Sequence, residues 1–188
     1  PVGLLRVTGP APRVRLAAPP YQTSAPPDAL PLSAPARLGY PAPQLGRGGA
    51  FTWYVQDCAL GLRYAIVAGA RRAGRETLIA FTIAVNSEGS DPLAVGRQRV
   101  EQALSAGWAK VRAGHVRWWR EFWSASGVSL PHAELERHYY LTQYFYGAAS
   151  RRGAPPLALQ GLWTADEGTL PPWRGDYHND LNTQMTYW

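Results

Sequence analysis

The sequence predicts a multi-domain α+β chain in which an antiparallel β-sandwich portion precedes a helical region. Up to about residue 90, short runs rich in aromatic and β-branched residues alternate with glycine-containing turns. After Ser90-Asp91-Pro92, apolar residues instead recur every three or four positions, as on one face of an amphipathic helix. A chain of 188 residues can hold one or two domains and bury a real core.

Residues 1–90 are expected to form the later part of the sandwich domain. Residues 1–50 are dense in Pro, Ala and Gly, a composition that favours loops and short strands over helices. Short extended runs are expected at 3–8 and 13–16, and clearer strands at 51–56, 62–68 and 77–85. An Arg-Arg-Ala-Gly turn is expected between the last two strands. Several short strands separated by turns are typical of an antiparallel sandwich.

Residues 91–130 are expected to form a helical linker. Ser90 or Asp91 can cap its start, with Pro92 in the first turn. A break is expected near Gly107 or Gly114. The apolar stripe of this helix comprises Val100, Leu104, Trp108, Val111, His115, Trp119 and Phe122. We interpret His115 as a packed residue of that stripe and not as a catalytic group.

Residues 131–188 are expected to begin an α-helical domain. Leu130-Pro131 opens a helix that runs to about Ser150 and carries aromatic residues over a wide arc. We therefore expect this helix to be buried on most of its circumference, with its tyrosines packed in a core.

Charge and cysteine content exclude some classes of protein. The net charge of +6 comes from scattered arginines, with Lys110 the sole lysine and no nucleic-acid-binding motif, so nucleic acid is not an expected partner. The single Cys58 excludes an internal disulfide and is interpreted as a small core residue. No apolar run approaches the roughly 20 residues that span a bilayer.

The segment from residue 159 to 188 carries most of the chemical information. Flat aromatic faces beside short planar hydrogen-bonding groups suit a sugar ring, which shows apolar C–H faces and a rim of hydroxyls. Its candidate sugar-binding residues are Trp163, Trp173, Asp176, His178 and Gln184, and its candidate catalytic residues are Asp180 and Asn182. The structural alternative is that Asp176 caps a turn, Asn182 bonds a loop carbonyl, and the tryptophans are core.

Glycine and proline at 153–156 and 171–172 predict a folded-back loop that presents these side chains. From Asp180 onward the spacing of apolar residues is helical. In a regular helix, Asp180 and Asn182 would stand about 160° apart and could not hold one water, at about 100° per residue. In an extended segment, alternate side chains share a face, so the catalytic hypothesis requires an extended path from Asp180 to Asn182.

Three motifs give the chain a resemblance to a known family. The first segment is HVRWWREFWSASGVSLP. The second is ERHYYLTQYFYGAASRRGAPPLALQGLW, which ends in LQGLW. The third is PPWRGDYHNDLNTQMTYW, which begins with PPW and ends in N-x-x-M-x-YW. Together they resemble glycoside hydrolase family 95, the inverting α-L-fucosidases and related α-L-galactosidases, over roughly residues 91–188. The resemblance implies a linker helix after an N-terminal β-sandwich, then the first part of an (α/α)6 barrel.

The resemblance also implies roles for individual residues. In that family two asparagines in an N-x-N pattern hold the attacking water, an aspartate acts as base, and a barrel glutamate is the general acid. Asn182 matches the second asparagine, and Asp180 stands at the first position, where an aspartate could itself activate water. His178 matches a position that contacts the sugar. The general acid is expected beyond Trp188, so we expect these residues alone to be inactive.

We therefore expect an inverting glycosidase for terminal α-L-fucosyl or related α-linked sugars, with an oligosaccharide or glycoconjugate substrate and no metal or organic cofactor. One alternative is a non-catalytic carbohydrate-binding protein. Another is a disaccharide phosphorylase or hydrolase of a related (α/α)6 family. Enzymes of this family often work outside the cytoplasm, which would place the protein in the extracellular space or the periplasm. As an isolated polypeptide, these residues are expected to aggregate or stay molten.

Overall fold

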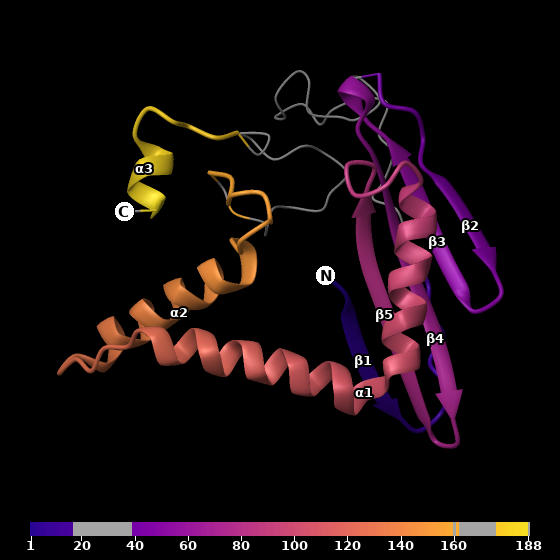
Figure 1. Ribbon diagram of the computed structural model, residues 1–188, viewed down its shortest axis with the longest axis horizontal. Coiled ribbons are helices and arrows are strands. Elements are labelled where there is room, and N and C mark those ends of the chain that lie inside the picture. The colour runs from indigo at the N-terminus through magenta and orange to yellow at the C-terminus, as the bar shows by residue number, and fades with distance from the viewer. Residues whose placement is uncertain (17–38, 160, 162–175, 188) are drawn as a thin grey trace, which may run out of the picture. The chain divides into compact units, whose positions relative to one another are not determined.

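The computed structural model describes residues 1–16, 39–159, 161 and 176–187. They fall into two compact units, Pro1–His115 and Val116–Trp188 (Figure 1). The first unit is a β-sheet with a helix on one face. The second unit is helical and carries the loop that holds the candidate site. The antiparallel strands and the helices that follow them confirm the predicted α+β organisation.

The first unit contains a five-stranded antiparallel sheet. Its strands have the order β1-β5-β4-β3-β2, with a 3₁₀ turn at Ala59–Gly61 between β3 and β4. Their bounds are β1 Gly3–Thr8, β2 Gln44–Gly48, β3 Phe51–Asp57, β4 Arg63–Ala73 and β5 Glu76–Val85. The strands predicted at 3–8, 51–56 and 77–85 are therefore present.

One of the strand predictions is wrong, since no strand forms at 13–16. β2 forms at residues 44–48, in the region whose composition favoured loops and short strands and where no particular strand was predicted. Gly46 lies opposite Trp53 in the sheet, and a Cβ on Gly46 would lie 2.6 Å from the indole ring. The glycine that looks like a loop residue therefore makes room for an aromatic neighbour within a strand.

β4 is longer than the sequence predicted. It begins at Arg63 and continues to Ala73, so the expected Arg-Arg-Ala-Gly turn shrinks to Gly74 and Arg75. Both arginines of the predicted turn find main-chain acceptors: Arg71 donates to the carbonyl of Leu104 at 3.2 Å, and Arg72 to that of Gly9 at 3.1 Å. Gly74 has a φ of 58°, which places the tight turn at that residue.

The core of the first unit lies between one face of the sheet and the first half of helix α1, which spans Pro92–Ala125 (Figure 1). Val67 of β4 and Val100 of α1 are fully buried. Small residues let the helix approach the sheet: a Cβ on Gly69 would lie 2.9 Å from Val100 Cγ1. Burial of this apolar surface is the main source of the unit's stability.

Helix α1 begins and breaks where the sequence predicted. Asp91 Oδ1 accepts hydrogen bonds from the amides of Leu93 and Ala94, at 2.9 and 3.2 Å, and so caps the helix. At Gly107 the backbone leaves the helical region, with φ 76° and ψ 168°. Of the two glycines predicted as break points, Gly107 is therefore the one that breaks the helix.

The other face of the sheet carries exposed apolar side chains. The strand register places them on the side opposite α1, and they include Leu5, Leu45, Phe81 and Ile83. The part of the chain that the structure describes contains one sheet.

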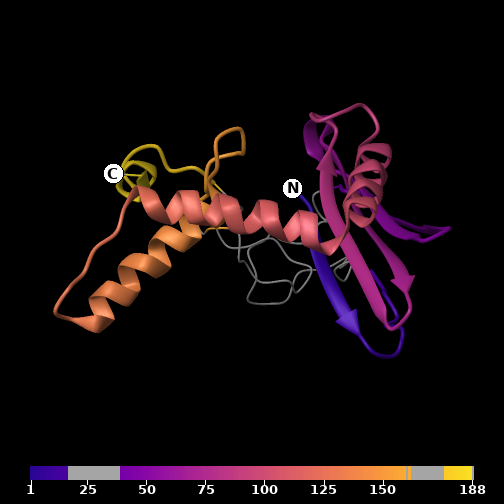
Figure 2. The same ribbon diagram turned by 60° about the horizontal axis from the view of Figure 1, so that its bottom comes forward.

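The second unit is built on stacked aromatic rings. The last turns of α1 run beside α2, which spans Ala133–Ala149 (Figure 2). Trp119 stacks on Tyr144 with ring centroids 5.3 Å apart, and Trp123 meets Tyr140 edge-on at 5.9 Å. The Tyr140 hydroxyl donates to the carbonyl of Val128 at 2.9 Å. These tyrosines thus contact the rings of α1, but the prediction that they pack in a core is wrong for Tyr144, which is exposed.

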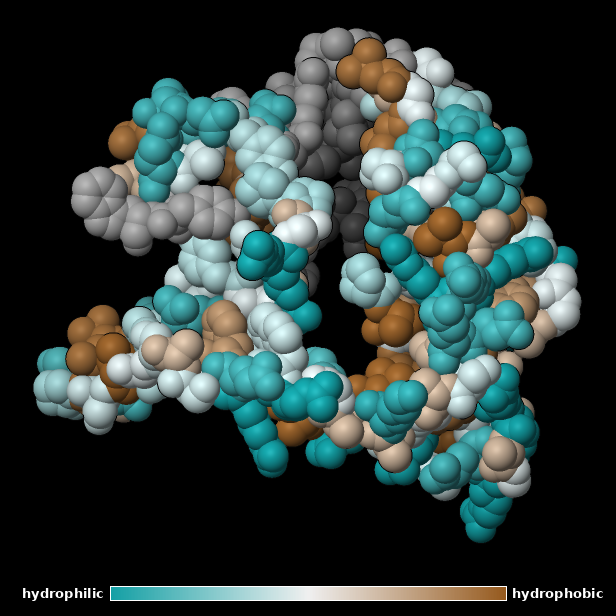
Figure 3. Space-filling model, viewed as in Figure 1, coloured by the Kyte–Doolittle hydropathy of each residue, from teal (hydrophilic) through white to brown (hydrophobic). Residues whose placement is uncertain are grey.

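The expectation that α2 is buried on most of its circumference is wrong. Among its residues only Gly147 and Ala149 are buried, because α2 packs on α1 along one side. Figure 3 shows apolar side chains at the surface near the start of this helix. The exposed apolar residues of this region are Leu130, Leu135, Leu141, Tyr144 and Phe145.

Candidate functional site

The loop after α2 folds back on itself. It leaves the helix through a turn in which the amide of Ala154 donates to the carbonyl of Arg151 at 2.9 Å. Farther along, the amide of Leu159 donates to the carbonyl of Asp176 at 3.1 Å. The prediction of a folded-back loop is confirmed for its described ends, whereas the prolines at 171–172 lie outside the described residues.

Arg151 fixes the start of this loop to the helices. Its guanidinium carbon lies 3.7 Å from the ring centroid of Trp118 and 5.9 Å from that of Trp119. Its Nε donates to the carbonyl of Gly147 at 2.9 Å, which satisfies an acceptor in the last turn of α2. Arg151 therefore combines a cation–π contact with a helix C-terminal hydrogen bond.

Asp176 and His178 lie close together where the chain returns. His178 Nε2 is 3.8 Å from Asp176 Oδ2, and their side chains are 29% and 56% exposed. The carboxylate can attract the imidazole when the imidazole is protonated. Two of the predicted sugar-binding residues thus stand beside each other, one half-buried and the other facing solvent.

Asp180 and Asn182 lie at the start of a short helix. Leu181 N donates to Asp180 Oδ1 at 2.9 Å, and α3 spans Asn182–Tyr187. The amide of Thr183 donates to the carbonyl of His178 at 2.8 Å, which closes the chain into a turn. The extended path that the catalytic hypothesis required is therefore absent. Both side chains are exposed, and their catalytic roles stay a prediction.

Gln184 is the last described candidate. Its Nε2 donates to the carbonyl of Asn179, so its amide stabilises the turn before α3. The two tryptophans predicted to bind sugar, Trp163 and Trp173, lie outside the described residues.

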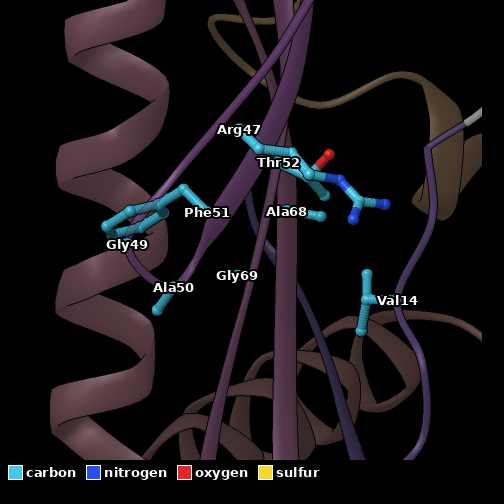
Figure 4. A pocket seen from close by; sticks show the side chains of 8 residues that line it. All are labelled: Val14, Arg47, Gly49, Ala50, Phe51, Thr52, Ala68 and Gly69. Carbon is cyan, nitrogen blue, oxygen red and sulfur yellow. The ribbon is translucent and has the colours of Figure 1, made fainter.

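A small cavity of about 170 Å³ in the first unit is a weaker candidate (Figure 4). Arg47 and Val14 lie on the side of the sheet away from the helix, and Phe51 lies on the helix side. Arg47 is the one charged residue of this lining, and the rest is apolar or glycine apart from Thr52. Such a lining offers a ligand one guanidinium and one hydroxyl, and no general acid or base.

The described residues hold neither a cluster of metal ligands nor an activated thiol. No three His, Cys, Asp or Glu side chains among them lie where they could share a metal ion. None of the described helices is both long and apolar enough to cross a bilayer. Cys58 is half-buried, and burial followed by the negative charge of Asp57 raises the pKa of its thiol. Its thiolate is thus disfavoured. The prediction that Cys58 is a core residue is nevertheless wrong, because the residue is only half-buried.

Tyr177 and Arg151 have roles in the loop that the sequence did not predict. The Tyr177 hydroxyl donates to the carbonyl of Pro156 at 2.7 Å and joins the two ends of the loop. An arginine placed directly after a helix, with a Trp-Trp pair in the preceding helix, was the available signal for the stacking of Arg151. No sequence signal identified the acceptor of Tyr177.

Comparison with known proteins finds a family match within the second unit. The profile of the glycosyl hydrolase family 95 catalytic domain matches residues 123–188. A protein named probable alpha-fucosidase A from Aspergillus niger is 48% identical over 46 residues, which cover 24% of this chain and 6% of the relative. Its namesake from Aspergillus oryzae is 27% identical over 126 residues, which cover 54% of this chain and 17% of the relative.

The matched segments are therefore a small part of the length of these curated relatives. The profile begins near the end of α1 and includes α2, the folded-back loop and α3. It thus covers every candidate site residue proposed above. Residues 123–188 are thus similar to the catalytic domain of glycosyl hydrolase family 95.

Proposed function

We propose that the full-length protein containing this chain is an inverting glycoside hydrolase that removes a terminal α-L-fucosyl or related α-linked sugar. The observation that carries the proposal is the match of residues 123–188 to the family 95 catalytic domain. The names of the two Aspergillus relatives support α-L-fucose as the first sugar to test. A glycoside hydrolase domain implies a carbohydrate substrate.

We assign the attacking water to Asp180 and Asn182. Asp180 would remove its proton and Asn182 would orient it, while a glutamate elsewhere in the catalytic domain protonates the leaving oxygen. An inverting site needs its two carboxyl groups roughly 6.5–9.5 Å apart to leave room for that water. One oxygen of Asp180 accepts the amide of Leu181, which leaves the other oxygen for water.

His178, Asp176, Gln184, Trp163 and Trp173 are proposed to contact the sugar. The proximity of Asp176 to His178 supports a shared role, because the carboxylate would orient the imidazole. Substrate binding would also have to bring Asp180 and Asn182 to one water, since a turn separates them here.

We also propose the domain organisation that the family implies: a β-sandwich portion at 1–90, a helical linker at 91–130 and the first part of an (α/α)6 barrel at 131–188. The exposed apolar face of the sheet, with Phe81 and Ile83, supports a second sheet packed against it. The exposed Leu135 and Leu141 of α2 support further helices around it.

The test is hydrolysis by the full-length protein of an aryl α-L-fucoside and of a panel of other aryl glycosides. Proton NMR during the first minutes identifies the anomer released, and an inverting enzyme releases the β-anomer from an α-glycoside. Release of the α-anomer would contradict the inverting mechanism. Binding of fucose without turnover would favour a carbohydrate-binding protein, and turnover only with inorganic phosphate would favour a phosphorylase.

The residue assignments are tested with Asp180→Ala and Asn182→Ala, and Asn179→Ala is the matched control. Asn179 is exposed in the same turn and has no proposed role in the reaction. We expect turnover to fall by about a hundredfold or more in Asp180→Ala, since general base catalysis contributes at least that factor. A similar fall of about a hundredfold is expected in Asn182→Ala, since a displacement of about 1 Å at a reacting group can cost that much. Unchanged turnover in either would remove that residue from the mechanism.

A further inference from the structure

We infer that Tyr177 is a positioning residue of the proposed glycosidase site. Its hydroxyl donates to the carbonyl oxygen of Pro156 at 2.7 Å, across the folded-back loop. The inference rests on the proposed function, because it assigns Tyr177 a role in holding the residues that function requires.

A second hydrogen bond joins the same two ends of the loop. The amide of Leu159 donates to the carbonyl of Asp176 at 3.1 Å, next to Tyr177 in the chain. We call this pair of hydrogen bonds, Tyr177 to Pro156 and Leu159 to Asp176, the loop clasp. Two bonds at successive residues fix both the position and the direction of the returning chain.

The acceptor is well placed for such a role. Pro156 follows another proline, and each ring fixes the φ angle of its residue. Two fixed φ angles reduce the conformational freedom of the residues that carry this carbonyl. Five residues earlier, Arg151 holds the start of the loop to α2.

The clasp lies directly before the candidate site residues. His178 follows Tyr177, and its carbonyl accepts the amide of Thr183, from which α3 continues. The main-chain path from the clasp to Asp180 and Asn182 is thus short and hydrogen-bonded at both ends. Loss of the clasp would shift this turn, and a displacement of about 1 Å at a reacting group can cost about a hundredfold in rate.

A direct sugar contact by Tyr177 predicts a different result. The side chain is 44% exposed, so its ring could stack on a sugar. Tyr177→Phe keeps the ring and removes only the hydroxyl, which separates the two roles. If the ring stacks on the sugar, Tyr177→Phe should keep the kcat and KM of the wild type. If the hydroxyl binds the sugar, its removal should raise KM without lowering kcat.

The experiment compares Tyr177→Phe with Tyr140→Phe in the full-length protein. Tyr140 is a matched control because its hydroxyl also donates to a main-chain carbonyl, that of Val128 at 2.9 Å, away from the loop. Hydrogen–deuterium exchange is followed in the peptide that contains the amide of Leu159. Steady-state kinetics on the aryl glycoside hydrolysed by the wild type give kcat and KM.

We expect Tyr177→Phe to accelerate exchange at Leu159 and to lower kcat, each by about tenfold, with KM within about twofold of the wild type. Tyr140→Phe should change neither the exchange at Leu159 nor kcat. Unchanged exchange in Tyr177→Phe would overturn the clasp, and unchanged kcat would overturn its positioning role. If the wild type hydrolyses no glycoside, the proposed function and this positioning role fail together, while the exchange result still decides whether the clasp exists.

Discussion

Gly96 of α1 lies directly against Val67 of β4, and a Cβ on Gly96 would stand 2.6 Å from Val67 Cγ2. Val67 is fully buried and β-branched, so it cannot rotate away without cost. We expect Gly96→Ala to destabilise the full-length protein by about 1–3 kcal/mol through overpacking. Chemical denaturation followed by circular dichroism measures this change.

Val67→Ala in the same background is the control for that contact. It removes the methyl groups that Cβ would meet, so the cost of Gly96→Ala should be smaller in the double variant than in wild type. Equal losses of stability in the two backgrounds would show that the Gly96–Val67 contact is not the cause of the destabilisation by Gly96→Ala.

Gly107 and Gly114 predict opposite effects of the same substitution. A Cβ added to either residue would have no neighbouring heavy atom within 4 Å, so steric contacts would not make the two substitutions differ. Gly107 has φ 76° and ψ 168°, a region that is nearly exclusive to glycine, whereas Gly114 is helical. Gly107→Ala should lose about 1–3 kcal/mol of stability, and Gly114→Ala should gain about 0.5–1 kcal/mol.

Thermal unfolding of the two variants beside the wild-type protein checks this pair. A rise in Tm for Gly107→Ala would show that α1 can close into a continuous helix at that position. A fall in Tm for Gly114→Ala would mean that this glycine has a packing role the structure does not show.

The ion pair of Glu88 with Arg99 predicts a pH-dependent stability. The two side chains pair through two contacts, at 2.8 and 3.1 Å, and Glu88 also accepts the amide of Val85. The hydrogen bond from Arg99, followed by that from Val85, lowers the pKa of Glu88 below its ordinary value of 4.5. This stabilisation is therefore present above the unfolded-state pKa and is lost as the pH falls through the folded-state pKa.

We expect Glu88→Gln to lose about 0.5 kcal/mol at neutral pH, a small value because 33% of the Glu88 side chain is exposed and screened by solvent. The difference from wild type should disappear in acid, where Glu88 is protonated in both states. Denaturant titrations across the acid range measure it. Glu101→Gln, on the exposed surface of α1, controls for the change in net charge, and an equal loss there would contradict a specific ion pair.

Arg151 should not tolerate lysine, although the charge is kept. The flat guanidinium stacks 3.7 Å from the centroid of Trp118, and an ammonium group cannot reproduce that contact together with the hydrogen bond to Gly147. We expect Arg151→Lys to cost about 0.5–1 kcal/mol. Near-ultraviolet circular dichroism of the tryptophans and Tm measure the change, and Arg152→Lys is the neighbouring control.

Residues 1–188 produced as an isolated polypeptide should aggregate or remain molten. Apolar side chains such as Phe81, Ile83 and Leu135 are exposed on both units, and exposed patches of this kind promote association. Light scattering and dye binding measure this behaviour. A sharp, cooperative thermal transition of the soluble monomer would contradict the prediction.

Sequence patterns predicted the strands and helices whose buried residues recur with a simple period. β5 and α1 are examples, because every second or every third to fourth residue packs on the same surface. β2 was missed since the reason for Gly46 lies on the neighbouring strand, at Trp53. The extension of β4 was missed since Arg71 and Arg72 find acceptors far away in the chain.

The candidate site was predictable in its residue types and not in its geometry. Glycine and proline at 153–156 indicated the fold-back, which is local chemistry. The relation of Asp180 to Asn182 depended on whether a turn or an extended segment joins them, and the periodicity beyond Asp180 could not decide where α3 begins. The hydrogen bond from the amide of Thr183 to the carbonyl of His178 determines where α3 begins, and no residue type in the sequence predicts this bond.

The break at Gly107 divides α1 into two hydrogen-bond ladders of ordinary helix length. Helix formation is cooperative only along an unbroken ladder, so fraying or folding in residues 92–106 is not passed along the backbone to residues 108–125. Along the backbone, the helix that covers the sheet and the helix that carries the aromatic stack are therefore two separate cooperative segments.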